Sequence, residues 1–291
     1  MPELPEVEVT RRRIAPLLVG RRVTRLHTSR PSYFFLTPPL LLRRGLEGRE
    51  VRALTRVGKY LLAEIEGGGR LLLHLGMTGQ LFTSGVASVR LLSASRRAAL
   101  APEQQTRFEP DRHTHLRFRF EDGAPDVLFR DVRKFGKVQL LGPGEPCARI
   151  ERLGTDALAV AGADLFGATR RRSAAIKTLL LDQAVVAGTG NIYADEALFL
   201  AGVRPARPAG RVTRAECERI AEALRRVMLR SIETGGSSIS DYVAPDGADG
   251  AYQDERRVYA RTDEPCHACG RKILRRVLGQ RSAHWCPGCQ R

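Results

Sequence analysis

The sequence lacks any run of about 18 consecutive apolar residues, the length that a helix needs to cross a bilayer. It also lacks the form of a secretory signal, because residues 1–9 carry three glutamates and no basic residue ahead of an apolar run. Cysteine is scarce, with six in 291 residues, which excludes a small disulfide-based scaffold. We therefore expect a globular cytoplasmic protein without a membrane span and long enough for two domains.

Acidic side chains are also in deficit. Aspartate and glutamate number 32 against 48 lysines and arginines, which gives a formal net charge of +16 at pH 7. Such a balance favours a polyanionic partner, and nucleic acid is the first candidate. Charge alone leaves a second interpretation open, in which an arginine-rich surface only meets water.

The first residues form an unusual chemical group if the initiator Met1 is removed. Pro2 then carries a secondary amine, and an α-amino group has a pKa near 8, against about 10.4 for lysine. More of it is the free nucleophile at neutral pH, so it can attack an aldehyde-level carbon and form a Schiff base. The neighbouring carboxylic acid, Glu3, is a candidate acid–base partner.

The same stretch has the pattern of a helix start. Proline and acidic residues suit the first turn, and Gly20 stands where a helix would end. Residues at helical spacing lie between them: Val7, Arg11, Ile14 and Leu18. On these residues alone, an ordinary helix start and a reactive terminus held by a helix both stay open.

Four of the six cysteines are arranged as two Cys-x2-Cys pairs, Cys266/Cys269 and Cys286/Cys289, with sixteen residues between the pairs. Four thiolates at this spacing complete a tetrahedral, closed structural zinc site. His267 and His284 are nearby alternative ligands, but four cysteines already saturate the metal. The segment between the pairs is basic, which is typical of a nucleic-acid-binding finger.

Residues 21–141 predict mostly short strands separated by glycine turns. The clearest is 114–121, where Leu116, Phe118 and Phe120 fall on one face and His115 falls on the other, polar face. Further strands are expected at 49–57, 60–66, 70–75, 127–130 and 137–141. This pattern favours a β-sandwich or a barrel, interrupted at 83–110 by a long surface loop or an inserted helix.

Helices are expected after a linker candidate at residues 142–146. Two short ones, at 173–182 and 191–201, flank a glycine turn, Gly188-Thr189-Gly190, with Asn191 as a possible N-cap. Such a turn can grip a backbone phosphate, although it can equally be an ordinary corner between two helices. A capping box at residues 213–216 begins a longer helix, which two glycines end. Residues 237–255 predict a mobile loop.

Two glycine-flanked loops, at 74–79 and 131–136, carry side chains that suit a DNA stack. Met77 and Phe135, beside Arg133, could be wedges that enter between bases, although such residues are more often part of a core. Lys59, at a strand junction, could meet a phosphate or only solvent.

Taken together, these segments resemble the formamidopyrimidine-DNA glycosylase family of bifunctional repair enzymes, over nearly the whole chain. The motifs that carry the resemblance are Met-Pro-Glu-Leu-Pro-Glu-Val at 1–7, Lys-Tyr-Leu-Leu at 59–62, His-Leu-Gly-Met-Thr-Gly at 74–79, Arg-Lys-Phe-Gly at 133–136, Ile-Lys at 176–177, Gly-Thr-Gly-Asn-Ile-Tyr-Ala-Asp-Glu at 188–196, and the four-cysteine finger. Leu4 favours the oxidised-purine branch over the related endonuclease VIII branch, which tends to have glycine there.

The resemblance implies an α+β fold with two domains. An N-terminal β-sandwich with an N-terminal helix would span residues 1–141, followed by a linker at 142–150. A helical domain with a helix–two-turn–helix would span 151–236. A mobile loop that closes over the lesion would span 237–255, and a zinc finger with one structural zinc ion would span 256–291.

The resemblance also implies a chemistry. Pro2 would attack C1′ of a flipped, damaged nucleotide, and Glu3 would donate a proton near the sugar. Successive β- and δ-elimination would then cut the strand, with Lys59 as proton donor or phosphate contact and Arg281 holding a phosphate during elimination. Glu6 and Glu196 would shape the lesion pocket.

Further DNA contacts are implied for five residues. Lys177 and Asn191 match positions that hold phosphates around the lesion. Met77, Arg133 and Phe135 match the trio that fills the vacated stack, with Arg133 reading the orphaned cytosine. One departure is Val-Arg-Lys at 132–134, where Pro-Arg-Arg is more usual, and a second is the length of 83–110.

These implications predict an enzyme that removes 8-oxoguanine and formamidopyrimidines from double-stranded DNA and works as a monomer. Two alternatives remain. One is an oxidised-pyrimidine glycosylase of the endonuclease VIII kind. The other is a zinc-containing protein that binds damaged DNA without cutting it, which would need neither a free Pro2 nor Glu3.

Overall fold

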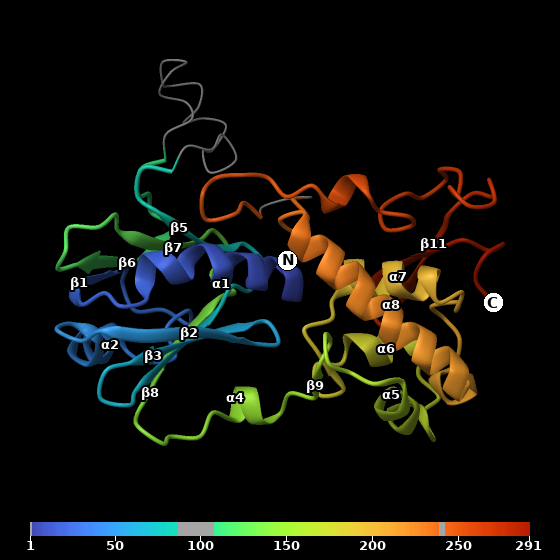
Figure 1. Cartoon of the computed structure of the whole chain (residues 1–291), viewed down its shortest axis with the longest axis horizontal. Helices are drawn as coiled ribbons and strands as arrows, with labels where there is room; N and C mark the ends of the chain where they lie inside the picture. The colour runs from blue at the N-terminus through green and yellow to red at the C-terminus, as the bar shows by residue number, and fades with distance from the viewer. Residues whose placement is uncertain (1, 87–107, 239–241) are drawn as a thin grey trace, which may run out of the picture. The chain divides into compact units, whose positions relative to one another are not determined.

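The structure of the protein is a computed structural model that describes residues 2–86, 108–238 and 242–291. The chain divides into two compact units (Figure 1). The N-terminal unit contains Met1–Cys147 and Gly235–Ala251, and the C-terminal unit contains Ala148–Thr234 and Tyr252–Arg291. The segment after residue 234 thus belongs first to one unit and then to the other.

The N-terminal unit is built on two antiparallel sheets of four strands each. The first has the order β1-β6-β7-β5, with β1 at Val23–Thr28, β6 at Thr114–Phe120, β7 at Val127–Asp131 and β5 at Gly79–Thr83. The second has the order β2-β3-β4-β8, with β2 at Val51–Val57, β3 at Tyr60–Ile65, β4 at Arg70–His74 and β8 at Lys137–Leu141. The predicted β-sandwich is confirmed.

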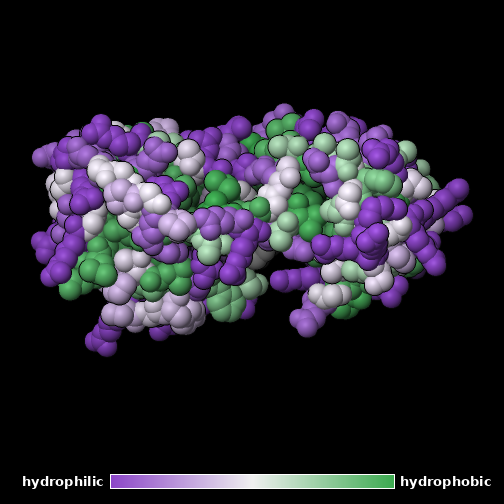
Figure 2. Space-filling model, turned by 90° about the horizontal axis from the view of Figure 1, so that it is seen from below, coloured by the Kyte–Doolittle hydropathy of each residue, from purple (hydrophilic) through white to green (hydrophobic). Residues whose placement is uncertain are grey.

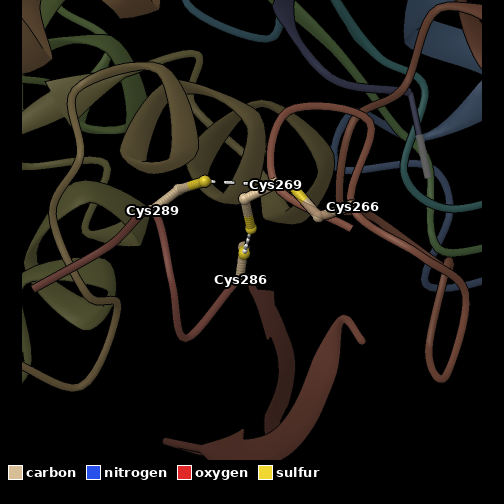
Figure 3. Close-up of side chains that lie close together, drawn as sticks. All are labelled: Cys266, Cys269, Cys286 and Cys289. Carbon is tan, nitrogen blue, oxygen red and sulfur yellow. Dashed lines mark hydrogen bonds between the residues drawn. The ribbon is translucent and has the colours of Figure 1, made fainter. Parts of the chain in front are cut away.

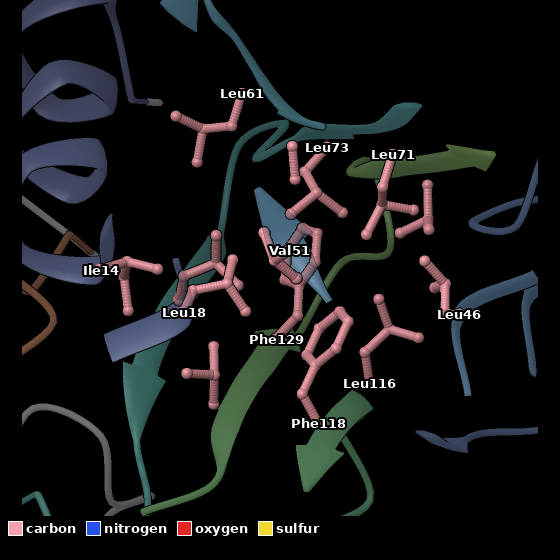
Figure 4. Packing of buried hydrophobic residues seen from close by; sticks show 14 of the residues in the cluster. Ile14, Leu18, Leu46, Val51, Leu61, Leu71, Leu73, Leu116, Phe118 and Phe129 are labelled. Atoms are coloured by element: carbon pink, nitrogen blue, oxygen red, sulfur yellow. The ribbon is translucent and has the colours of Figure 1, made fainter. Parts of the chain in front are cut away.

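One hydrophobic core joins the two sheets (Figure 4). Leu61, Leu71 and Leu73 come from the second sheet, while Leu116 and Phe129 come from the first, and each is at most 2% exposed. Strand alternation explains this packing, because every second side chain points to the same face. The two-residue period read from the sequence therefore located the core.

His115 departs from that period. It was expected on the polar face of β6, but it is only 1% exposed. Its Nδ1 lies 3.0 Å from the Ser29 hydroxyl and its Nε2 lies 2.9 Å from the Asp131 carbonyl oxygen. Burial lowers the pKa of the His115 imidazole, so the ring is neutral and satisfied by these two partners.

Helix α1, Leu4–Leu18, packs on this core through Val7, Ile14 and Leu18. A capping box begins it, since the Glu3 side chain accepts from the third helical amide and the Glu6 side chain accepts from the Glu3 N–H. A second helix, α2 at Pro39–Leu46, was not expected from the sequence. Of the interruption expected at 83–110, residues 87–107 lie outside the described residues.

The C-terminal unit is mainly helical. Its helices are α4 at Ala148–Glu151, α5 at Gly162–Thr169, α6 at Ile176–Leu181, α7 at Asn191–Leu200 and α8 at Arg214–Glu233. Two short parallel strands, β9 at Thr155–Asp156 and β10 at Val186–Ala187, pair with each other. The helix expected at 173–182 is shorter than predicted. It begins only at Ile176, because Ala175 has a non-helical backbone and forms the N-cap of α6.

The longest helix, α8, has the ends that its sequence predicted. Thr213 and Glu216 form the capping box, and the Thr213 hydroxyl accepts from the Glu216 amide. Gly235 and Gly236, with φ of 81° and 88°, then take the left-handed conformation that favours glycine and turn the chain away.

The last element is a hairpin of β11, Leu274–Leu278, and β12, Arg281–Trp285. Gly279 and Gln280 join the strands with φ of 51° and 63°, as a type I′ turn requires. On the face shown in Figure 2, hydrophilic side chains cover much of the surface and hydrophobic ones gather in smaller patches. Among the described residues, no helix has both the length and the apolar character to span a membrane.

Candidate active site

The first two residues that matter chemically are held by the start of α1. Pro2 is buried and Glu3 is only 3% exposed. The Glu3 N–H donates to Glu6 Oε2 at 2.9 Å, so the capping box fixes the backbone from which Pro2 and Glu3 project. The helix start and the reactive terminus, which were two interpretations of one stretch, are thus compatible in one structure.

Glu6 has a second structural task. Its Oε1 accepts from the Ser237 N–H at 3.0 Å, and its main-chain carbonyl accepts from the Tyr242 hydroxyl at 3.2 Å. Arg13, further along α1, forms an ion pair with Asp246. These contacts tie the segment Gly235–Ala251 to α1, on the same helix that carries Glu3.

That segment was expected to be a mobile loop. Its described part contains buried residues, among them Ser237, Tyr242 and Val243. Burial, with a contribution from the Glu6 charge, raises the pKa of the Tyr242 hydroxyl. Residues 239–241 lie outside the described residues, and closure over a flipped base stays a prediction.

Lys59 lies in the tight turn between β2 and β3 and is 7% exposed. Gly58 before it has φ of 55°, a left-handed conformation that suits glycine. The Arg56 guanidinium donates to the Gly58 carbonyl at 2.8 Å and to Glu8 Oε2 at 3.3 Å. The helix that carries the N-terminus therefore also steadies the turn that carries Lys59.

Glu8 is the hub of this connection. Its carboxylate accepts from Arg11 at 2.8 Å and from Arg12 at 2.8 Å, in addition to Arg56. Burial alone would raise the pKa of the Glu8 carboxyl, but the three arginines outweigh it and lower the pKa to about 2. Glu8 is thus a carboxylate at neutral pH. Glu8 was not among the residues expected at the site.

The two loops expected to enter the base stack lie in the N-terminal unit. Arg133 and Phe135 are exposed, Met77 is half-buried, and the Arg133 guanidinium lies 4.7 Å from the centroid of the Phe135 ring. Exposed apolar and cationic side chains on short loops are suited to contact with stacked bases. Their role with DNA stays a prediction.

In the C-terminal unit, Lys177 is found in an unexpected environment. It was expected to meet a phosphate, but it is 0% exposed and its ammonium lies 2.7 Å from Asp195 Oδ1. Asp195 Oδ2 also accepts from the His284 amide at 2.9 Å, and the ammonium donates to the Ser282 carbonyl. Lys177 thus joins α6 to α7 and to the strand β12, and its phosphate contact stays a prediction.

The start of α7 also differs from the expectation. Gly190, rather than Asn191, is the N-cap, with an extended φ of −134°. Asn191 is the first helical residue, and its amide donates to the Ser282 hydroxyl at 3.2 Å. Ser282 follows Arg281, which is exposed at the beginning of β12. Asn191 therefore lies close to the strand that carries Arg281.

Glu196 was expected in the lesion pocket, but in this structure its carboxylate binds backbone amides. It is 1% exposed, and its two oxygens accept from the amides of Arg257, Val258 and Tyr259 at 2.8–2.9 Å. Burial raises the pKa of the Glu196 carboxyl, although the three amide donors oppose the rise. Its contact with a lesion stays a prediction.

The four paired cysteines come together as predicted (Figure 3). The sulfurs of Cys269 and Cys286 are 3.3 Å apart, those of Cys266 and Cys289 are 3.9 Å apart, and all four lie within 4.8 Å of one another. A tetrahedron with Zn–S bonds of about 2.3 Å has sulfurs about 3.8 Å apart, so the set fits one zinc ion.

The four thiols differ in how readily each loses its proton. A backbone amide at Arg271 and the neighbouring thiols lower the pKa of Cys269 to about 7, whereas burial and the other sulfurs raise the pKa of Cys289 to about 12. Zinc would hold all four as thiolates. The residues present therefore suit a closed structural site that staples the end of the chain.

The structure distributes the expected site residues over both units. The N-terminal unit holds Pro2, Glu3, Glu6, Lys59, Met77, Arg133 and Phe135. The C-terminal unit holds Lys177, Asn191, Glu196, Arg281 and the four zinc-binding cysteines. Three carboxylates that hold these residues in place were missed, namely Glu8, Asp131 and Asp195. Each has a partner that is distant in the sequence: Arg56, Thr78 and Lys177, respectively.

Three domain families match the chain. The N-terminal domain of formamidopyrimidine-DNA glycosylase matches residues 1–138, and its helix–two-turn–helix domain matches residues 153–243. A zinc finger found in this glycosylase and in isoleucyl-tRNA synthetase matches residues 263–291.

Similar proteins extend over the full length. The formamidopyrimidine-DNA glycosylases of Solibacter usitatus and Alkalilimnicola ehrlichii are 39% and 41% identical to the chain, each over 100% of both chains. The crystal structure of the MutM (Fpg) protein from Thermus thermophilus is 37% identical, with a TM-score of 0.83, and the match covers 99% of this chain and 98% of that one. A Lactococcus lactis Fpg mutant in complex with DNA containing Fapy-dG is 30% identical, with a TM-score of 0.85 over 100% of both chains.

These matches confirm the predicted fold, with its β-sandwich, helix–two-turn–helix and zinc finger. The chain belongs to the formamidopyrimidine-DNA glycosylase family.

Proposed function

We propose that this enzyme, a formamidopyrimidine-DNA glycosylase with lyase activity, removes oxidised purines from double-stranded DNA and cuts the strand at the resulting site. The family and its full-length relatives support the activity. Solved relatives hold DNA with Fapy-dG, with an abasic site and with carbocyclic 8-oxo-G, which supports the substrate class. The observation that carries the proposal is the Pro2–Glu3 pair, buried and fixed by the capping box of α1.

The first step follows from the chemistry of the terminus. Once Met1 is removed, the Pro2 nitrogen attacks C1′, the bond from C1′ to the base breaks, and the base leaves with the proton that the amine loses. The C1′–O4′ bond of the sugar then breaks, O4′ takes up a proton, and the nitrogen lone pair forms the double bond of the iminium. Glu3, one residue away, is the acid that gives the sugar oxygen its proton. The capping box limits the motion of both residues, so the amine and the acid keep one relative geometry.

The second stage is elimination from the iminium. Loss of a proton from C2′ expels the 3′ phosphate, and a further elimination expels the 5′ phosphate. Lys59, in its steadied turn, and Arg281, on β12, are the cations we assign to these phosphates. Lys177 and Asn191 support Arg281 indirectly, because both donate hydrogen bonds to Ser282, the residue that follows it.

Zinc has a structural part in this proposal. Cys266, Cys269, Cys286 and Cys289 would hold one ion, which fixes the hairpin that carries Arg281. Because the substrate is genomic DNA, we place the working enzyme on the nucleoid in the cytoplasm, as a monomer.

A cleavage assay with a panel of duplexes tests the proposal. We expect strand scission at 8-oxoguanine and formamidopyrimidine opposite cytosine, and little at oxidised pyrimidines. Faster cleavage of oxidised pyrimidines would instead indicate an enzyme of the endonuclease VIII kind. Binding of all lesions without scission would indicate a damage-binding protein. If the wild type cleaves the oxidised-purine duplexes, Glu3→Gln should slow base release by about a hundredfold or more, the usual contribution of general acid catalysis.

A further inference from the structure

One buried carboxylate in the N-terminal unit joins the two loops that carry Met77, Arg133 and Phe135. Asp131, the last residue of β7, is 0% exposed. Its Oδ1 accepts from the Thr78 hydroxyl and from the Arg133 N–H, the latter at 3.2 Å. Its Oδ2 accepts from the Gly136 N–H at 2.7 Å. A single side chain therefore spans the loop 131–136 and ties it to the loop 74–79.

The main chain of Arg133 is held from both sides. Its N–H also donates to the Thr78 hydroxyl at 3.1 Å, and its carbonyl accepts from the Tyr33 hydroxyl at 3.0 Å. The Arg133 side chain is nevertheless exposed and stacks on Phe135. The backbone is thus fixed while the guanidinium is presented outwards.

The loops also meet backbone to backbone. A Cβ added to Gly76 would lie 2.4 Å from the Gly136 nitrogen, so only glycine permits this approach. Lys134 takes a left-handed φ of 57°, which costs energy for a residue with a side chain. Asp131 itself is anchored, because its N–H donates to the His113 carbonyl at 2.9 Å. The hydrogen bonds of Asp131 and the close approach of Gly76 hold the loop 131–136 in this strained conformation.

We propose that Asp131 is the positioning residue that sets how the enzyme selects the base opposite the lesion. The inference rests on the proposed function and on the role that the family resemblance implies for Arg133, which is to read the orphaned cytosine. An arginine that reads a base edge needs its planar guanidinium in one orientation. Hydrogen bonds to a carboxylate are shorter and stronger than neutral ones, so Asp131 holds the base of that side chain more firmly than a neutral residue would.

The test compares cleavage of 8-oxoguanine opposite cytosine with cleavage opposite adenine. In Asp131→Asn one of the two oxygens becomes an NH2 group, which cannot accept, so either the Gly136 N–H or the Thr78 hydroxyl and the Arg133 N–H lose their acceptor. We expect the ratio of kcat/KM for the two duplexes to fall about tenfold, the effect of losing one charge-assisted bond. Cleavage of a single-stranded abasic oligonucleotide, which has no opposite base, should change less than about twofold.

Four further variants separate positioning from stability. Tyr33→Phe removes one hydroxyl from a residue that is 60% exposed, and Thr78→Ser keeps the hydroxyl that Thr78→Val removes. We expect the ratio to fall about threefold in Tyr33→Phe and Thr78→Val and to hold in Thr78→Ser. Asp126→Asn, beside the other end of β7 and paired with Arg117, is the matched control and should keep the wild-type ratio.

Each outcome decides the inference. A wild-type enzyme without activity on either duplex would refute the proposed function and not the role of Asp131. An active wild type with an unchanged ratio in Asp131→Asn would overturn the role. An equal loss on duplex and single-stranded substrates would also overturn it, since that pattern marks general damage to the fold. If Asp131→Asn does not fold, unchanged ratios in Tyr33→Phe and Thr78→Val would overturn it.

Discussion

The Glu8 hub allows a prediction whose magnitude follows from the structure. Glu8→Gln removes the charge that binds Arg11, Arg12 and Arg56 while keeping the size of the side chain. A pKa lowered from 4.5 to about 2 corresponds to about 3 kcal/mol at neutral pH. Arg12 is 57% exposed, so solvent screens its share, and we expect the variant to lose about 2 kcal/mol of unfolding free energy at pH 7.

The pH dependence of this loss has a definite sign. The folded-state pKa of Glu8 lies below its unfolded value, so its stabilisation is complete above pH 4.5 and is lost as the pH falls towards 2. Glutamine cannot ionise. The difference in unfolding free energy between wild type and Glu8→Gln should therefore be largest at about pH 7 and narrow as the pH falls to about 3.

Urea unfolding followed by far-UV circular dichroism at several pH values measures this difference. Glu66→Gln is a matched control in the same unit, because the side chains of Glu66, Arg22 and Arg52 are each at least 35% exposed, against 9% for Glu8, so their ion pairs should contribute less. One contrary result is that wild type and Glu8→Gln unfold with equal free energies at neutral pH, and another is a difference that does not change with pH. Either result would refute the claim that the Glu8 charge stabilises the fold through its three arginine partners.

Three other predictions concern the buried ion pair of Lys177, the zinc cluster and the basic surface of the protein. Asp195→Asn leaves the buried Lys177 ammonium without its charged partner and should cost about 3–5 kcal/mol, measured by urea unfolding with Trp285 fluorescence, whereas Asp182→Asn, whose pair with Arg172 is exposed, should cost under about 1 kcal/mol. A similar cost for both variants would contradict the buried pair. Removal of zinc with a chelator should shift Trp285 fluorescence and abolish DNA binding, and binding that survives would exclude a structural metal. Raising salt from about 50 to 200 mM should weaken DNA binding at least a hundredfold, as counterion release predicts, and a flat salt response would contradict the basic surface as its cause.

The parts of this protein that could be predicted are those that depend on local order. The cysteine spacing predicts the zinc cluster, because each pair needs only a tight turn. The alternation of Leu116, Phe118 and Phe120 predicts a buried face, and the residues 213–216 predict where α8 begins. In each case the determining partners lie within one short stretch of the sequence, the longest being the zinc finger with sixteen residues between its cysteine pairs.

The parts that could not be predicted depend on partners brought together by the fold. The family resemblance implies a phosphate contact for Lys177, and nothing near Lys177 in the sequence indicates its ion pair with Asp195. His115 follows the polar face by period, yet its partners come from Ser29 and Asp131. Glu196 likewise meets three amides more than sixty residues away. Buried polar residues of this kind are visible only once the packing is known.

The most direct test of the account is to locate the covalent bond. The protein is incubated with a duplex that contains 8-oxoguanine opposite cytosine, and borohydride reduces any Schiff base. Peptide mass spectrometry of the trapped complex should place the deoxyribose adduct on the nitrogen of Pro2, with Met1 absent, and Pro2→Gly should trap much less. An adduct on a lysine such as Lys59, or trapping by Pro2→Gly equal to wild type, would contradict the terminal-amine mechanism.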